Sequence, residues 1–274
     1  MMDPRFPIGA SLADGAFVVE ERIRGEVTRG LYRGRDRAAS SGSVLVTIGT
    51  GQQRPFRDTA RDLSLPVDGI ARLRHVGPLA EDPSFHALVE DEPAGAPSSE
   101  RARRLAPRAA VSLALEVGRV LVNARAARWE LPHLRPELVY VLEQGGRVKM
   151  TAIAPRAEPF LAGAAPASPG VPPLFEAIYA APEVLALAPP SGKADVFALC
   201  GCLAYWATGE PPFQGDTPLG QLTALHKGAR RPFGGPAELA AVLAAGLELD
   251  PARRLTLSAL MEELARLVVS EGLR

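Results

Sequence analysis

The hydrophobic pattern of the chain changes near residue 93, and this change limits the folds that it can adopt. Before this point the sequence contains short runs of strand-like composition, which read FVVEERI, GLYRGRD, SVLVTI and FHALVED. Turns rich in Gly, Ser, Asp or Arg separate them, as is typical of β-strands. The segment DEPAGAPSSE, residues 91–100, is turn-rich and predicts a linker or hinge.

Apolar residues recur at helical spacing after the hinge, in two segments that are expected to be helices. They are Val111, Leu115, Val120 and Leu121 in the first, and Leu257, Leu260, Met261, Leu264 and Leu267 in the second, which has Thr256 as its expected N-cap. Residues 156–175 are rich in Ala, Pro and Gly and predict a long irregular loop. We therefore expect an α+β fold with a β-rich lobe over residues 1–92, a hinge at about 89–93, and a helical lobe over 93–274.

Composition excludes several kinds of function. The 274 residues include 31 Lys plus Arg and 31 Asp plus Glu, so no charge imbalance favours nucleic acid or an anionic membrane as a partner. Two cysteines in a predicted helix and four scattered histidines argue against a zinc site or a disulfide framework. No apolar run approaches the roughly 18 residues that cross a membrane. The start MMDPRFPIGA does not have the form of a secretion signal. We expect a cytoplasmic protein, or the soluble domain of a longer one.

Three ordered motifs indicate a family. YAAPEVLAL covers residues 179–187, KADVFALCGCLAYWATGEPPFQGDTPL covers 193–219, and ELDPARRLT covers 248–256. Their order and spacing resemble those of eukaryotic-like protein kinases, and most closely those of bacterial Ser/Thr kinases. The resemblance covers nearly the whole chain, weakly in the β-rich part and strongly after residue 179. It implies a bilobal kinase-like fold with a small antiparallel β-rich N-lobe and a larger helical C-lobe.

The resemblance also implies three scaffold residues. In the family the glutamate of the first motif forms a buried ion pair with the arginine of the third, which here are Glu183 and Arg254. The aspartate that holds the backbone of the catalytic loop corresponds to Asp195. All three residue types are retained.

The positions that would carry phosphoryl transfer are changed. The reaction needs a Lys on the phosphates, an Asp and an Asn on Mg²⁺, and an Asp that accepts the substrate proton. By the resemblance these positions hold Thr47 for the Lys, His133 for the base, Leu138 for the Asn and Ala152 for the metal Asp. Leu and Ala have no side-chain oxygen for Mg²⁺, so no metal site is expected.

Other parts of the expected site are also altered. The glycine-rich loop of the family falls on Arg24, Glu26 and Arg29, with Gly25 and Gly30 each one place out of register. The helix glutamate that pairs with the family's Lys has Asp58 as its best candidate and Asp62 as the next, in the segment PFRDTARDLSL, the one helical candidate among the strands. No cofactor is expected.

We therefore interpret the chain as a pseudokinase that acts as a scaffold or allosteric regulator in bacterial signalling, with an active kinase or a phosphopeptide-reading domain as possible partners. Two alternatives stay open. One is a nucleotide switch without phosphotransfer, in which Glu90, Asp91 and Glu92 of the hinge offer backbone hydrogen bonds to an adenine. The other is a transferase of non-standard chemistry, in which His133 is a substitute base.

Four arginines of the first lobe could form an anion patch, but a solvated hairpin is the favoured interpretation. They are Arg24, Arg29, Arg33 and Arg35. The two cysteines, Cys200 and Cys202, are expected to be core residues.

Overall fold

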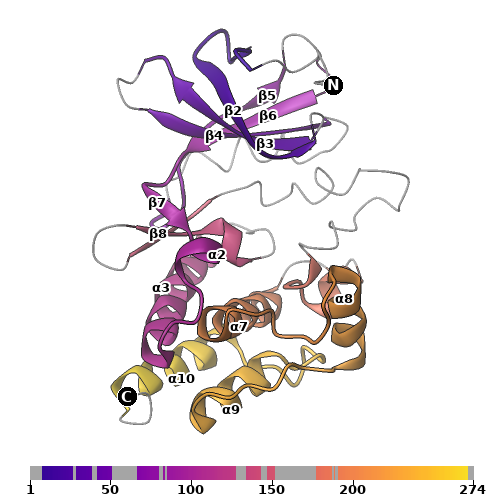
Figure 1. Cartoon of the computed structure of the whole chain (residues 1–274). Coiled ribbons are helices and arrows are strands. Elements are labelled where there is room, and N and C mark those ends of the chain that lie inside the picture. Colours follow the sequence, from indigo (N-terminus) through magenta and orange to yellow (C-terminus); the bar gives the residue numbers. More distant parts are fainter. Residues whose placement is uncertain are drawn as a thin grey trace. The chain divides into compact units, whose positions relative to one another are not determined.

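The chain folds into two compact units, which are described separately. One comprises Met1–Pro93 with Thr151–Gly170, and the other Ala94–Met150 with Val171–Arg274. Strands make up the first unit and helices dominate the second (Figure 1). The α+β class expected from the sequence is therefore confirmed. The computed structural model describes residues 8–26, 29–38, 42–50, 67–79, 83, 85–127, 134–142, 147–151, 177–186, 188 and 191–270, without the side chains of 24–26, 29–30, 49–50 and 85.

The first unit is built on one antiparallel sheet. Its strand order is β1-β2-β3-β4-β6-β5. The strands are β1 Ser11–Leu12, β2 Phe17–Glu26, β3 Arg29–Asp36, β4 Ser43–Thr50, β5 Leu73–Pro78 and β6 Phe85–Asp91. The four strand-like runs of the sequence correspond to β2, β3, β4 and β6.

Successive side chains of β4 point alternately to the two faces of this sheet. Val44, Val46 and Ile48 pack into an apolar core together with Ala87 and Val89 of β6. Successive side chains of a strand point to opposite faces, so Leu45 and Thr47 lie on the other face. The hairpin of β2 and β3 places Gly25 opposite Gly30, and its pairing ends with Glu26 opposite Arg29.

The segment expected to be a linker contains regular structure. It holds β7 Gly95–Pro97 and α2 Ser98–Arg101. The strand β7 pairs with β8 Val139–Leu142, which pairs in turn with β9 Val148–Met150. The two units divide at Pro93 and Ala94, inside this segment. Its strand and helix were not predicted, because β7 depends on a partner strand about forty residues away. The helical candidate PFRDTARDLSL and the loop at 156–175 lie outside the described residues.

The second unit is organised around a helix that is apolar on all sides. This helix, α7 Gly192–Thr208, packs against α3 Pro107–Ala126, α9 Ala237–Gly246 and α10 Leu257–Val269 (Figure 1). A helix with no polar face is stable only when it is enclosed by neighbours. Its ends are also specified: the Ser191 hydroxyl accepts a hydrogen bond from Ala194 N at 3.2 Å, and Gly209 adopts a left-handed conformation with φ 78°.

Local signals also set the remaining helices. α8 Pro218–Lys227 begins after Thr217, whose hydroxyl accepts a bond from Gly220 N at 3.1 Å. The prediction of Thr256 as the N-cap of α10 is confirmed, because its hydroxyl accepts from Ala259 N at 3.2 Å. The short elements are α6 Pro182–Leu185 and the 3₁₀ turn η1 Pro136–Leu138. Within the described part of the chain, no helix is long and apolar enough to cross a membrane.

We predict that acidification destabilises the first unit through His75 and His86. Burial lowers the pKa of both imidazoles. For His75 the negative charge of Asp14 acts in the opposite direction, but its effect on the pKa is smaller than that of burial. The unfolded chain therefore takes up protons at a higher pH than the folded chain does. The stability that the neutral imidazoles contribute is present above the ordinary histidine pKa of about 6.5 and is lost as the pH falls below it.

Urea unfolding at a series of pH values between 7.5 and 5 tests this prediction. The free energy of unfolding is expected to fall across the series, and the double variant His75→Gln, His86→Gln is expected to show a flatter profile. His226→Gln, at an exposed position on α8, serves as the control. A wild-type stability that rises on acidification would contradict the prediction.

Candidate functional site

The position expected to hold the phosphate-binding Lys is a buried neutral side chain. Thr47 lies opposite Leu88, and Leu45 lies opposite Glu90, so these four side chains share one face of the sheet. Thr47 is 5% exposed, and its hydroxyl has no hydrogen-bond partner among the described residues. Glu90 is fully buried on the same face. A hydroxyl supplies no positive charge, so Thr47 cannot neutralise phosphate oxygens as a lysine would.

The hinge uses its backbone donors within the first unit. Asp91 N donates to Arg72 O at 2.9 Å, and Glu92 N donates to Ser43 O at 3.1 Å. The next residue is Pro93, which has no N–H group. The backbone from Asp91 to Pro93 therefore has no free N–H to donate to an adenine ring.

The hinge side chains are also engaged. Glu92 accepts hydrogen bonds from Nε and Nη2 of Arg33 at 3.0 and 2.9 Å, and the Ser43 hydroxyl donates to the same carboxylate. Asp91 pairs with Arg74 at 2.9 Å, and Arg74 also donates to Asp36 at 2.6 Å. These pairs tie β3, the first residue of β4 and β5 to the end of β6 and to Glu92, which follows it.

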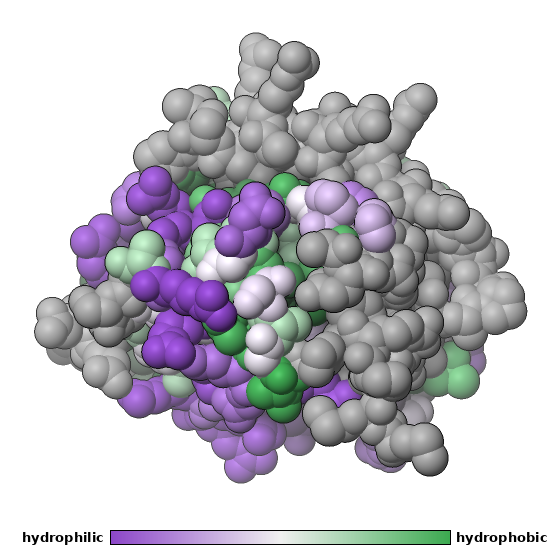
Figure 2. All heavy atoms as spheres, turned by 90° about the horizontal axis from the view of Figure 1, so that it is seen from above, coloured by the Kyte–Doolittle hydropathy of each residue, from purple (hydrophilic) through white to green (hydrophobic). Residues whose placement is uncertain are grey.

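Two arginines considered for an anion patch have carboxylate partners. Arg33 contacts Glu92 and, at 2.6 Å, Glu21, and its hydrogen bond with Glu92 raises the pKa of the guanidinium. Arg35 pairs with Glu20 at 2.9 Å. The other two arginines, at 24 and 29, have no described side chain. Seen from above, hydrophilic residues gather along one side of the described surface, and hydrophobic ones lie in the gaps between them (Figure 2).

The segment at 131–138, which the resemblance assigns to the catalytic loop, is firmly held at its described end. Ser98 donates a hydrogen bond to Pro136 O at 2.7 Å and accepts one from Trp206 Nε1 at 2.9 Å. Pro136 begins η1, and Leu138 ends it with a side chain that is 1% exposed. Arg135 is buried as well, with its Nε 3.9 Å from Glu137. The position expected to hold a metal-binding Asn is thus a buried aliphatic group at the end of an anchored turn.

The structure does not describe four of the predicted positions. His133 and Ala152 lie outside the described residues, as do Asp58 and Asp62. In the described ranges, no group of three or more His, Cys, Asp and Glu side chains is arranged to hold a metal ion.

The pairing of Glu183 with Arg254 is present. Arg254 Nη1 donates to Glu183 Oε1 at 2.6 Å, and Nη2 donates to Oε2 at 3.0 Å. The remaining guanidinium hydrogens point to the carbonyl oxygens of Lys193 at 2.8 Å, Glu248 at 2.8 Å and Leu249 at 3.2 Å. All five donors of the guanidinium therefore have acceptors, which is the condition for burying this charge.

An aromatic ring also covers one face of the planar Arg254 guanidinium. The guanidinium carbon of Arg254 lies 4.9 Å from the ring centroid of Phe197 in α7, a cation–π arrangement. Lys193 donates in return to Arg254 O. One arginine thus joins α6, the start of α7 and the turn that precedes α10.

Asp195 connects α7 with α3. Its carboxylate accepts a hydrogen bond from Arg125 Nε near the end of α3. Of the catalytic loop that Asp195 is expected to hold, residues 131–138, the first three lie outside the described part of the chain. The pair of Asp195 with Arg125 links α7 to α3.

The two cysteines have the properties of core residues. Cys200 and Cys202 are fully buried and are not joined by a disulfide. Burial raises the pKa of Cys200 to about 12 and that of Cys202 well above its usual value. Thiolate, the reactive form, is therefore disfavoured at neutral pH.

Sequence reasoning did not find Ser98, Trp206 or Pro93 as parts of the site. The bonds of Ser98 join residues that are 38 and 108 positions apart, and no local pattern signals such pairs. Pro93 did carry a readable signal, because a proline at the hinge removes one backbone donor whatever the fold.

The chain has a protein kinase-like fold. The structure of Rad53 residues 1–466 in complex with AMP-PNP matches it with a TM-score of 0.69 and 16% sequence identity, over 91% of this chain. This chain spans 65% of the length of that solved chain. No family model matches the sequence, and none of the curated proteins matches it either. At 16% identity the resemblance shows the fold and does not show an activity.

We predict that replacing one partner of the buried ion pair destabilises the second unit severely. Glu183→Ala leaves the Arg254 charge enclosed and unpaired, which costs about 3–5 kcal/mol of unfolding free energy. Arg253→Ala is the matched control, because its side chain is 75% exposed and lies 3.8 Å from Glu248. Removing an exposed pair of this kind costs about 0–1 kcal/mol.

Chemical denaturation of both variants measures the difference. A Glu183→Ala protein as stable as Arg253→Ala would mean that the ion pair does not hold these elements together. Arg254→Met tests the same pair from the other side, because it removes the charge and retains an apolar side chain.

Proposed function

We propose that the chain is a catalytically inactive pseudokinase that works by binding another protein. One observation carries the proposal: the segment that resembles a catalytic loop is anchored, and an aliphatic side chain stands where phosphoryl transfer would need a metal ligand. The Pro136 carbonyl is anchored by Ser98, yet Leu138, two residues later, presents a buried aliphatic side chain. No side-chain oxygen at this position can bind Mg²⁺.

Thr47 gives independent support from the first unit. A buried hydroxyl replaces the ammonium that the reaction places on the α and β phosphates. Loss of the cation and loss of a metal ligand remove two separate electrostatic contributions to phosphoryl transfer. Neither residue can substitute for the other, because one would act on phosphate and the other on the metal ion.

The hinge favours protein binding over a nucleotide switch. Asp91 and Glu92 donate their N–H groups within the first unit, and Pro93 has none. A purine would lose hydrogen bonds to water on entering this site without gaining a donor there, which lowers its affinity. We propose that the protein acts in the cytoplasm, in bacterial signalling, as a scaffold or allosteric partner. An active kinase or a phosphopeptide-reading domain is the proposed partner.

We predict that the purified protein neither binds nor hydrolyses ATP. Isothermal titration calorimetry is expected to give no heat of binding up to millimolar ATP, with or without Mg²⁺, and no rise in melting temperature. An active Ser/Thr kinase domain in the same assay serves as the positive control. Binding that does not depend on Mg²⁺ would favour the nucleotide switch. Binding that requires Mg²⁺ would mean that other residues form a metal site.

Two variants sharpen this test. Thr47→Lys is expected to remain inactive, because restoring the cation does not restore the metal ligand at Leu138. His133→Ala is expected to leave the biological activity of a scaffold unchanged. Phosphotransfer by the wild type that His133→Ala abolishes would instead identify a transferase with a substitute base and would refute the proposal.

A further inference from the structure

A groove lies in the second unit between the end of α7, the segment that follows it, and α9. Its volume is about 220 Å³, and most of its lining is apolar. The apolar lining includes Ala204, Pro211, Pro212, Pro232, Phe233 and Leu243. None of the scaffold residues that hold Arg254 lines it. The groove is therefore distinct from the site described above.

The walls of the groove are rigid. Arg231 N donates to Pro212 O at 2.8 Å, and Phe213 forms a β-bridge with Arg230, so the two wall segments are paired. Three prolines in the lining fix their own φ angles. A ligand that enters a preformed groove avoids most of the entropy cost of ordering it.

The polar groups of the wall already have partners inside the unit. Thr208 donates to Ala204 O at 2.7 Å. Arg230 donates to Ala244 O and to Leu247 O, both at 3.0 Å. These groups do not require a ligand to satisfy them, so the interior offers mainly apolar contact. The group that fits inside is an apolar side chain rather than a polar or charged one.

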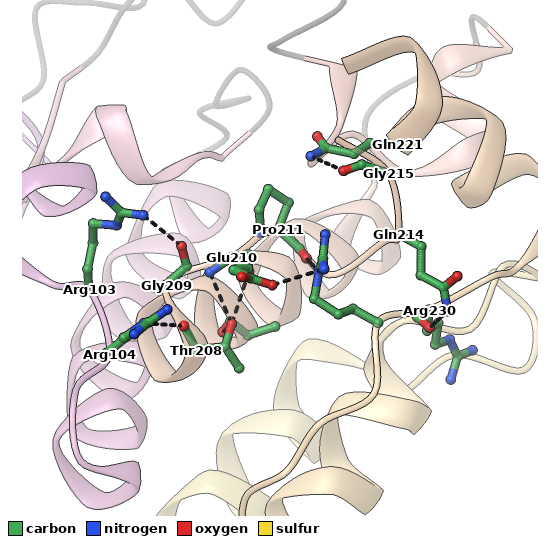
Figure 3. A network of polar contacts seen from close by, with 12 residues as sticks. Arg103, Arg104, Thr208, Gly209, Glu210, Pro211, Gln214, Gly215, Gln221 and Arg230 are labelled. Atoms are coloured by element: carbon green, nitrogen blue, oxygen red, sulfur yellow. Dashed lines mark hydrogen bonds and ion pairs between the residues drawn. The ribbon is translucent and has the colours of Figure 1, made fainter. Parts of the chain in front are cut away.

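Positive charge predominates around this groove, because the described residues that line it or bond to its lining segments include four arginines and two glutamates. They are Arg103, Arg104, Arg230 and Arg231, with Glu210 and Glu248. Arg103 and Arg104 donate to carbonyl oxygens of the segment at the end of α7, at 3.1 and 3.2 Å, and Figure 3 shows both reaching this segment from the same side. The excess of arginines gives the rim a positive potential, which attracts acidic groups.

We infer that the groove binds a peptide segment of a partner protein, with a large apolar side chain in the groove and acidic residues beside it at the rim. This inference rests on the proposed function, since it gives the protein-binding chain a docking surface. Apolar contact supplies the anchor, and the charges select the partner.

Selection from a displayed library of random peptides tests the inference with the full chain as bait. The enriched sequences are expected to combine one large apolar residue with Asp or Glu. Ala244 is an exposed groove residue on α9, and Ala244→Trp fills the groove. A synthetic peptide of the enriched sequence should bind this variant about tenfold or more weakly, as expected when one apolar anchor is excluded.

Ala241→Trp is the matched control, because residue 241 is an exposed alanine of the same helix outside the groove lining. It should bind the peptide as the wild type does, and thermal unfolding of both variants checks that they fold. A second variant, Arg231→Gln, removes rim charge without filling the groove and should weaken binding of the acidic peptide.

Several results would overturn the inference. They are an absence of enriched peptides, enriched peptides that are basic or have no apolar residue, and equal binding by the wild type and Ala244→Trp. A dimer in solution that only Ala244→Trp disrupts would assign the groove to a second copy of the chain. The two proposals can fail separately. A groove that binds no peptide would not show that the protein is an active enzyme, because peptide binding does not involve ATP. Phosphotransfer by the protein would refute the proposed function but would not show that the groove binds no peptide.

Discussion

The second unit depends on one buried charge. Arg254 has no exposed side-chain surface, and its five N–H groups meet one carboxylate and three carbonyl oxygens from separate parts of the unit. A guanidinium can be buried only when every donor is satisfied, because an unpaired charge in a medium of low polarity is strongly unfavourable. The positions of α6, of the start of α7 and of the turn before α10 are therefore mutually constrained. Moving any of them would leave a donor without an acceptor.

The residues that hold the backbone of the fold are not the residues that phosphoryl transfer would require. The frame is held by backbone carbonyls and a few polar side chains such as Ser98, whereas phosphoryl transfer needs particular charged groups projecting from it. Thr47 and Leu138, where the resemblance expects a charged group and an oxygen ligand, are neutral groups that are readily buried. The groups that hold the fold and the groups that phosphoryl transfer would need are therefore different ones, which is why the fold by itself does not show an activity.

Sequence reasoning reached the fold class because its signals are local. Strand alternation in the first part, the N-cap at Thr256 and the apolar character of α7 each depend on neighbours within a few residues. The pairing of Glu183 with Arg254 was inferred from motif resemblance, since nothing local connects residues 71 positions apart. The strand β7 was missed, because a three-residue strand becomes recognisable only beside β8.

The sequence alone determined which chemical groups are present. It established that Thr47 cannot supply a cation, that Leu138 cannot supply a metal ligand, and that Pro93 has no backbone donor. The tertiary structure decided which groups meet. In the folded chain the N–H groups of Asp91 and Glu92 already donate to backbone carbonyls, so neither is free for a ligand. The fold also pairs Arg33 with Glu92, and it forms the groove beside α9 from segments about thirty residues apart. The physical reason is that side-chain type is a property of each residue, whereas burial and hydrogen bonding depend on distant parts of the chain.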